Sequence, residues 1–244
     1  MRVLVTTAVP AERDAVAAAF TAPASAHPVP GAALSRVAFP AESHGVVLDL
    51  LAGGVGPAAA AASTAAALTS AALTGEPYDV VVSAGIGGGF RPGAPVGSLV
   101  LADDITVADL GAETPDGYVP VTELGFGAVT HRPPGSLVRE IAAVTGARQG
   151  TVLTVSTVTG SAARAAELRR RHPRALAEAM EGFGVAEAAA AHGVPVLEIR
   201  AVSNPVGPRD RAAWRIGEAL AALTGAFGKL APVLESWNPH DVTD

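Results

Sequence analysis

A carboxylate and an amide in the C-terminal third of the chain could together bind a small polar ligand. Glu181 stands in a short acidic turn, and Asn204 follows a buried strand expected over Pro195–Val202. A helix expected over Glu181–His192 reverses the chain between them, so both side chains should return to one end of the sheet. In open α/β sheets, ligands bind outside the carboxyl ends of the strands. This pair therefore favours a ligand that contains a diol and a heterocycle.

Glu12 is a further candidate acid, at the first turn of a helix that follows the first strand. A carboxylate at this place can simply stabilise the helix N-terminus through the helix dipole. The same strand end can instead direct the side chain into a ligand cleft. The sequence leaves both interpretations open.

Two glycine-rich segments follow expected strands. The segment Gly85–Gly89 has four glycines in five residues, which lets backbone N–H groups approach a ligand closely, although it could also be only a sharp turn. The spacing of Gly54, Gly56 and Ala59 resembles a dinucleotide-binding fingerprint. However, the next strand ends near Ala84 without the acidic residue that would hold a ribose. A tight turn that lets a helix pack on the sheet explains these glycines equally well.

The composition limits the possible partners. Of 244 residues, 49% are hydrophobic and 16% are charged, which is enough to fill a large core. The net charge of −6 argues against nucleic acid and against an anionic membrane surface as partners. Because cysteine is absent and the six histidines are scattered, we expect no disulfide, no metal site and no cofactor.

The N-terminal segment leads directly into a strand and lacks the features of a signal peptide. The apolar segment Pro57–Leu73 is short for a membrane span and contains several Ser and Thr residues, so a buried helix explains it better. We therefore expect a cytoplasmic protein without a membrane partner.

Strands and helices are expected to alternate along the chain. The pattern predicts strands over residues 2–6, 35–39, 45–51, 79–84, 98–107, 150–155 and 195–202. It predicts helices over residues 11–20, 57–74, 136–144, 161–171, 181–192 and 212–227. The irregular segment Gly111–Gly135 is long for a connection and suggests a functional or interface loop. This alternation predicts an α/β fold, a three-layer αβα single domain over residues 1–244 with a central mixed sheet.

These residues together resemble the nucleoside phosphorylase and methylthioadenosine nucleosidase superfamily. The resemblance covers nearly the whole chain in the expected order and rests on Ala8 with Glu12, Gly54-Val55-Gly56, Ala84–Gly89, Met180-Glu181 and Ser203-Asn204. The segment Ser203–Arg211, followed by Trp214, is similar to one branch of that superfamily. Enzymes of that branch release hypoxanthine from a modified nucleoside by hydrolysis, on a route to menaquinone. The resemblance thus implies a nucleoside phosphorylase-like fold and a small-molecule nucleoside substrate.

The resemblance also implies roles for individual residues. Glu12 would position and deprotonate the attacking water, and Glu181 with Met180 would bind the ribose through its hydroxyls and one face. Gly88 would lie beside the base and sugar. Backbone groups of Val158 and Thr159 would form hydrogen bonds with the purine.

Two departures from the pattern of related enzymes refine this hypothesis. Asn204 stands where the adenine-specific nucleosidases have an aspartate. Its NH₂ group can donate to purine N7 and to a carbonyl at C6, which predicts a 6-oxopurine such as hypoxanthine, activated by hydrogen bonding to the departing anion. Ile86 replaces a serine that can contact phosphate, and Glu12 replaces a phosphate-binding arginine, so water is favoured as the nucleophile.

The predicted reaction is dissociative hydrolysis of the N-glycosidic bond. The nucleoside of this branch carries an aryl ketone with a carboxylate at its 5′ end, for which Arg209 and Arg211 are candidate ligands and Phe126 a candidate cover. The two arginines could equally pair with Asp210. We also expect a homo-oligomer, a dimer or higher.

Three alternatives remain open. A purine nucleoside phosphorylase would need a phosphate ligand, for which Arg91 is the best available residue. A general 6-oxopurine nucleosidase would not discriminate at the 5′ end. A non-catalytic nucleotide-binding protein is favoured only by the turn at Gly54.

Overall fold

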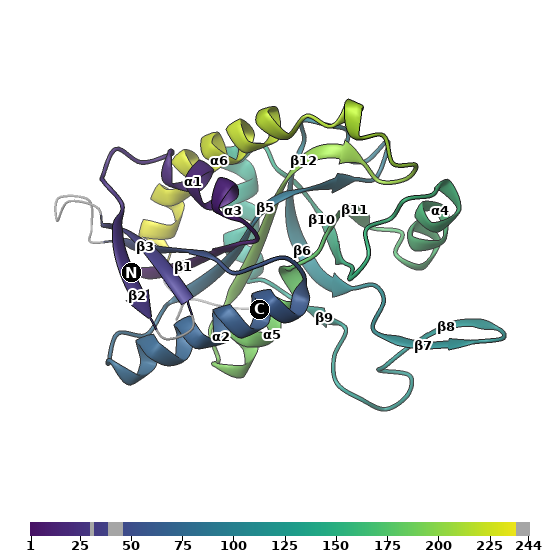
Figure 1. Cartoon of the computed structure of the whole chain (residues 1–244), viewed down its shortest axis with the longest axis horizontal. Helices are drawn as coiled ribbons and strands as arrows, with labels where there is room; N and C mark the ends of the chain where they lie inside the picture. The colour runs from purple at the N-terminus through teal and green to yellow at the C-terminus, as the bar shows by residue number, and fades with distance from the viewer. Residues whose placement is uncertain (30–31, 39–45, 238–244) are drawn as a thin grey trace.

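A mixed sheet with helices on both faces forms the body of the molecule, as the sequence predicts (Figure 1). The computed structural model describes residues 1–29, 32–38 and 46–237. Its sheet strands are β1 (Arg2–Thr7), β2 (Ser25–Val29), β3 (Ala32–Ala38), β4 (Val47–Ala52), β5 (Val80–Gly89), β6 (Leu99–Val107), β9 (Thr130–His131), β10 (Arg148–Thr154), β11 (Ala175–Ala179) and β12 (Val196–Pro205). Its α-helices are α1 (Pro10–Ala17), α2 (Pro57–Leu73), α3 (Gly135–Thr145), α4 (Ala162–Arg171), α5 (Gly182–Ala191) and α6 (Ile216–Ser236).

The strand order is β11-β10-β6-β12-β5-β1-β4-β3-β2, and β9 pairs with β6. Strand β12 runs parallel to β5 and antiparallel to β6, so the sheet is mixed. Strand β11 also pairs with the end of β5, which closes the strands β11, β10, β6, β12 and β5 into a ring. The closure brings the ends of β5, β11 and β12 together, where the sequence places its candidate site residues.

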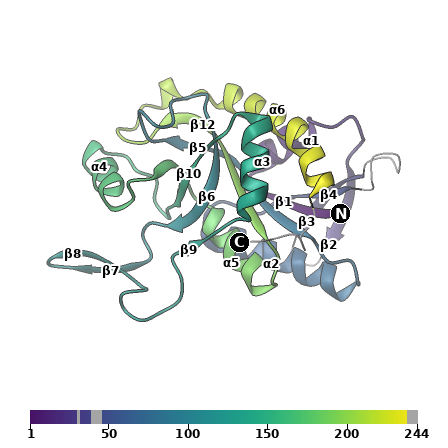
Figure 2. The ribbon, with the colours of Figure 1, turned by 180° about the vertical axis from the view of Figure 1, so that it is seen from behind.

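Two apolar clusters fill the space between the sheet and the helices. One packs α1, α3 and α6 on one face, through side chains such as Val16, Ile141 and Phe227. The other packs α2 and α5 on the opposite face, through Leu68 and Phe183 among others. Figure 2, the view from behind relative to Figure 1, shows α3 and α6 on the side of the sheet away from α2 and α5. The segment 57–73 is thus a helix with a buried face, as predicted, and no helix in the described ranges could cross a membrane.

The glycine-rich segment Gly85–Gly89 belongs to β5 itself and is not a turn, which corrects the sequence-based interpretation of its structure. Close neighbours on both sides explain why these positions need glycine. A Cβ atom at Gly87 would lie 2.8 Å from the carbonyl oxygen of Glu178. At Gly89 it would lie 2.6 Å from Cγ1 of Val202. Side chains at these positions would therefore push β11 and β12 away from β5.

The sequence-based prediction missed β2, β9 and β11, each of which is short and lacks a clear alternating pattern. The predicted strand pair over residues 35–39 and 45–51 corresponds to antiparallel β3 and β4, and residues 39 and 45 lie outside the described residues. The last helix was predicted over residues 212–227 but begins at Ile216, after a 3₁₀ turn over Arg211–Ala213, and continues to Ser236.

The long segment between β6 and α3 is not wholly irregular. It contains the antiparallel hairpin β7 (Gly111–Thr114) and β8 (Gly117–Pro120), which is separate from the main sheet. Both views show this hairpin projecting away from the body of the molecule (Figures 1 and 2).

Candidate active site

A cleft of about 380 Å³ opens where β1, β5, β11 and β12 end, a volume within the range of small-molecule sites. The sequence-predicted residues that line it are Glu12, Gly88, Val158, Thr159, Met180, Glu181, Asn204 and Arg209. Arg211 is not among the lining residues. The fold thus brings together residues from the first helix, from β5 and from the segment between residues 158 and 209.

Glu12 is fixed by backbone N–H groups from two strand ends. Its Oε2 atom accepts hydrogen bonds from the N–H groups of Ala8 (3.0 Å) and Val9 (3.3 Å), which precede α1. Its Oε1 atom accepts from Ile86 N–H (2.9 Å), in β5. The side chain is only 4% exposed but lines the cleft. The two interpretations of Glu12 are therefore compatible, since one carboxylate both caps the helix and reaches the cleft.

Glu181 is held in a similar way on the opposite side of the cleft. Its Oε1 atom accepts from Gly56 N–H (3.2 Å), and its Oε2 atom accepts from Met180 N–H (3.3 Å). Gly56 can aim its N–H group there because it adopts φ = +92°, a conformation that favours glycine. The turn that resembles a dinucleotide fingerprint therefore serves to orient Glu181.

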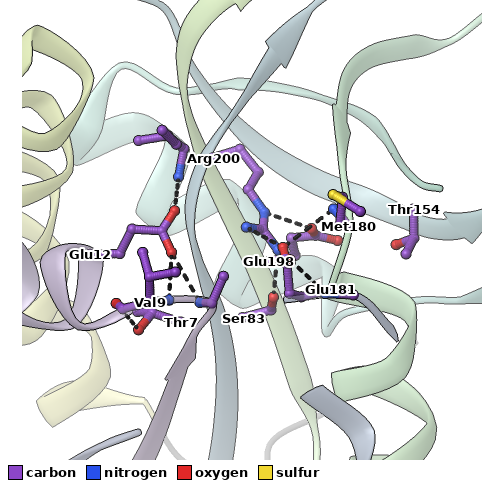
Figure 3. Close-up of polar contacts among 12 residues, drawn as sticks. Thr7, Val9, Glu12, Ser83, Thr154, Met180, Glu181, Glu198 and Arg200 are labelled. Atoms are coloured by element: carbon purple, nitrogen blue, oxygen red, sulfur yellow. Dashed lines mark hydrogen bonds and ion pairs between the residues drawn. The ribbon is translucent and has the colours of Figure 1, made fainter. Parts of the chain in front are cut away.

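Arg200 is a buried cation that sequence reasoning missed. It is 1% exposed and donates to Glu198 Oε1 (2.9 Å), Ser83 Oγ (2.9 Å) and Glu181 Oε2 (3.4 Å) (Figure 3). A Cβ atom at Gly85 would lie 2.7 Å from its Nη1 atom and 2.6 Å from Glu12 Oε1. The guanidinium group therefore lies between the carboxylates of Glu12 and Glu181.

Burial and charge pairing act in opposite directions on the pKa values of Arg200 and Glu198. Burial alone would lower the pKa of Arg200, but the carboxylates of Glu198, Glu181 and Glu12 raise it above its ordinary value. Burial raises the pKa of the Glu198 carboxyl group, in opposition to Arg200. The sequence did contain a signal for this ion pair. Glu198 and Arg200 stand two positions apart in an otherwise apolar strand, and buried charges are rare unless they are paired.

Asn204 owes its orientation to an irregularity in β12. The register with β5 shifts between Val202 and Asn204, and such bulges re-aim side chains. Ser203 Oγ lies 2.9 Å from Asn204 Oδ1, and Asn204 Nδ2 donates to Pro205 O (3.1 Å). Since an amide NH₂ group has two hydrogens, the other one can be donated to a ligand in the cleft.

Of the residues predicted to bind or cover the 5′ end, Arg209 lines the cleft, whereas Arg211 and Phe126 do not. The guanidinium groups of Arg209 and Arg211 lie 5.8 Å and 5.9 Å from the centre of the Trp214 ring. Phe126 is 69% exposed and lines a different hollow, together with Leu110 and Phe183. Arg91, the phosphate ligand of the alternative hypothesis, is exposed and does not line the cleft.

Comparisons with known proteins place the chain in a family. A family model described as "Phosphorylase superfamily" matches residues 2–234. A futalosine hydrolase of Streptomyces coelicolor is 74% identical over 99% of this chain and 100% of that protein. A futalosine hydrolase of Acidothermus cellulolyticus is 45% identical over 93% of this chain and 89% of that protein.

Solved structures share the fold at much lower sequence identity. The S-adenosylhomocysteine nucleosidase of Streptococcus pyogenes, solved with 5-methylthiotubericidin, superposes with a TM-score of 0.80 at 19% identity. The superposition covers 96% of this chain and 97% of that one.

Proposed function

The chain belongs to the phosphorylase superfamily, and on that premise we propose that it hydrolyses the N-glycosidic bond of futalosine, a 6-oxopurine nucleoside. The products are hypoxanthine and dehypoxanthine futalosine, in a step of menaquinone biosynthesis. The observation that carries the proposal is the 74% identity with a futalosine hydrolase over essentially the whole chain. We expect the enzyme to act as a cytoplasmic homo-oligomer.

In this proposal Glu181 and Met180 bind the ribose. The carboxylate of Glu181 accepts hydrogen bonds from the 2′- and 3′-hydroxyls, while the thioether of Met180 packs on the sugar face. Support comes from the fixed orientation of Glu181, whose oxygens already accept bonds from Gly56, Met180 and Arg200. A clamp that is already ordered binds its ligand at a smaller entropic cost.

Bond cleavage leaves positive charge on the sugar and negative charge on the base. Asn204 shares its second amide hydrogen between purine N7 and O6, so that negative charge is stabilised as it develops. Glu12 accepts a hydrogen bond from a water molecule and removes a proton from that water as the water attacks C1′. A general base of this kind accelerates the reaction by about 10²–10⁴-fold. The carboxylates of Glu12 and Glu181 both stabilise the oxocarbenium-like centre electrostatically.

The cleft favours water over phosphate as nucleophile. Arg200 is buried and paired with carboxylates, so it is not free to bind an anion. Arg209 is the single Lys or Arg side chain that lines the cleft in the described residues, and it lies at the mouth beside Trp214. A phosphate dianion next to Glu12 and Glu181 would be repelled.

We expect futalosine to be cleaved at least about 10²-fold more efficiently than inosine, in the absence of phosphate. Its 5′ carboxylate would pair with Arg209, and a hydrogen bond to a charged group contributes about 1.5–3 kcal/mol. Arg209→Ala should therefore lower kcat/KM for futalosine by about 10- to 100-fold and change inosine cleavage little. The measurement is kcat/KM for both nucleosides, with Arg211→Ala as the comparison variant because Arg211 does not line the cleft.

Equal efficiency on both nucleosides in the unmodified enzyme would contradict the futalosine assignment and leave a general 6-oxopurine nucleosidase. A requirement for phosphate would indicate a phosphorylase instead.

Exposed apolar side chains support the expectation of a homo-oligomer. Leu110, Leu124 and Phe126 are each more than 40% exposed, close in sequence to the projecting β7–β8 hairpin. Leu110 and Phe126 also line one hollow. Exposed patches of this kind commonly mark an interface, and the commonest oligomer is a two-fold dimer.

If this surface forms a dimer, Phe126→Asp should shift the molar mass measured by light scattering from that of a dimer toward that of a monomer. Leu73→Asp is the matched control and should leave the molar mass unchanged, because Leu73 is 84% exposed at the C-terminal end of α2. A wild-type protein that is monomeric at micromolar concentration would contradict the proposal.

A further inference from the structure

Glu178 is a buried carboxylate in the cleft to which the reaction described above gives no role. It is 5% exposed, lies in β11 and lines the cleft together with Thr159. Its Oε1 atom accepts a hydrogen bond from Thr159 N–H (2.8 Å), and its Oε2 atom accepts from the Thr159 hydroxyl. Each carboxylate oxygen can accept a second bond, so Glu178 can still take a donor from a ligand.

Glu178 and Asn204 flank the same residue of β5. Gly88 pairs with Glu178 in antiparallel β11 and with Asn204 in parallel β12. Neighbouring strands lie about 4.8 Å apart, so two spacings separate the backbones of Glu178 and Asn204 by roughly 10 Å. Since Gly88 has no side chain and all three residues line the cleft, a flat heterocycle fits between the carboxylate and the amide.

The two groups present complementary hydrogen-bonding chemistry to a purine. The Asn204 NH₂ group is a donor, whereas an ionised carboxylate such as Glu178 is only an acceptor. A 6-oxopurine carries acceptors at N7 and O6 and a donor at N1–H. Adenine has an acceptor at N1, which a carboxylate would repel.

We infer that Glu178 determines base specificity by accepting a hydrogen bond from N1–H of the 6-oxopurine. Glu178 and Asn204 together recognise the edge of the base that carries N7, O6 and N1–H. Glu178 also excludes bases whose N1 atom is an acceptor without a hydrogen. The inference rests on the proposed function only in its choice of a 6-oxopurine. Burial raises the pKa of Glu178, and an N–H donor from the base would stabilise the ionised form against that effect.

Binding of free bases tests this role without turnover. For Glu178→Gln, we expect hypoxanthine affinity to fall at least about 10-fold, because a charge-assisted bond is replaced by a weaker neutral one. Affinity for unsubstituted purine, which has a bare acceptor at N1 and no O6, should not fall and should rise if the new amide NH₂ group donates to N1. The measurement is Kd by calorimetry for both bases, with thermal melting to confirm that the variant is folded.

Glu140→Gln is the matched control, because Glu140 is an exposed carboxylate of α3 that does not line the cleft. Both Kd values should stay near those of the wild-type protein. Equal loss of both bases in Glu178→Gln would show that Glu178 only holds the Thr159 segment, and no loss would also overturn the inference. If the wild-type protein itself does not prefer hypoxanthine to adenine, the 6-oxopurine assignment of the proposed function fails instead.

Discussion

Glu12→Gln is expected to lower kcat for nucleoside hydrolysis by at least about 10²-fold while ligand binding is largely retained. The amide has no basicity to remove a proton from water. Its NH₂ group also cannot accept the hydrogen bond that either carboxylate oxygen now receives, whether from Ile86 N–H or from Ala8 and Val9. The measurement is kcat for futalosine together with Kd for hypoxanthine.

A change in stability has to be separated from this loss of activity. One unsatisfied buried N–H group costs about 1–3 kcal/mol, which a domain of ordinary stability tolerates. Asp14→Asn is the matched control, because Asp14 lies in the same helix, is exposed and pairs only with its neighbour Arg13 among the described residues. A kcat near that of the wild-type enzyme in Glu12→Gln would mean that Glu12 only caps the helix.

The placement of Glu12, Glu181 and Asn204 in one cleft could be predicted from sequence. Glu12 and Asn204 follow predicted strands with a clear apolar pattern, and the helix after Glu181 leads the chain into the second of these strands. Strand ends of an α/β sheet meet at one edge, so residues distant in sequence can be assigned to one site. The predicted alternation of strands and helices was enough for that purpose and for the fold class.

Other parts of the fold depend on tertiary contacts that no local pattern reveals. Strand β11 has the sequence Ala-Leu-Ala-Glu-Ala, whose small residues favour a helix by intrinsic propensity. It is a strand because it pairs with β10 and with the glycines that end β5. The role of Glu178 was missed for the same reason, since its place beside the cleft follows from that pairing.

The buried Arg200 is expected to affect both the stability of the fold and the activity of the site. Removing one partner of a buried ion pair leaves an uncompensated charge, and the destabilisation is typically about 3–5 kcal/mol. Arg200→Met keeps a long apolar stem but leaves the Glu198 and Glu181 carboxylates without their cation. We expect its free energy of unfolding, measured with urea, to fall by that amount, and kcat/KM to fall at least about 10²-fold through misplacement of Glu181 and Glu12.

A double variant separates these two effects. Glu198→Met added to Arg200→Met removes the fully buried carboxylate that Arg200 pairs with. Replacement of a whole buried ion pair by apolar residues is often neutral or stabilising relative to the intact pair, so most of the lost stability should return. Activity should stay low, because Glu181 still lacks the bond from Arg200 Nη1 and Glu12 still lacks a neighbouring cation. Recovery of both stability and kcat/KM in the double variant would mean that Arg200 only neutralises Glu198. Recovery of stability alone would show that one guanidinium group positions the ribose-binding and water-binding carboxylates.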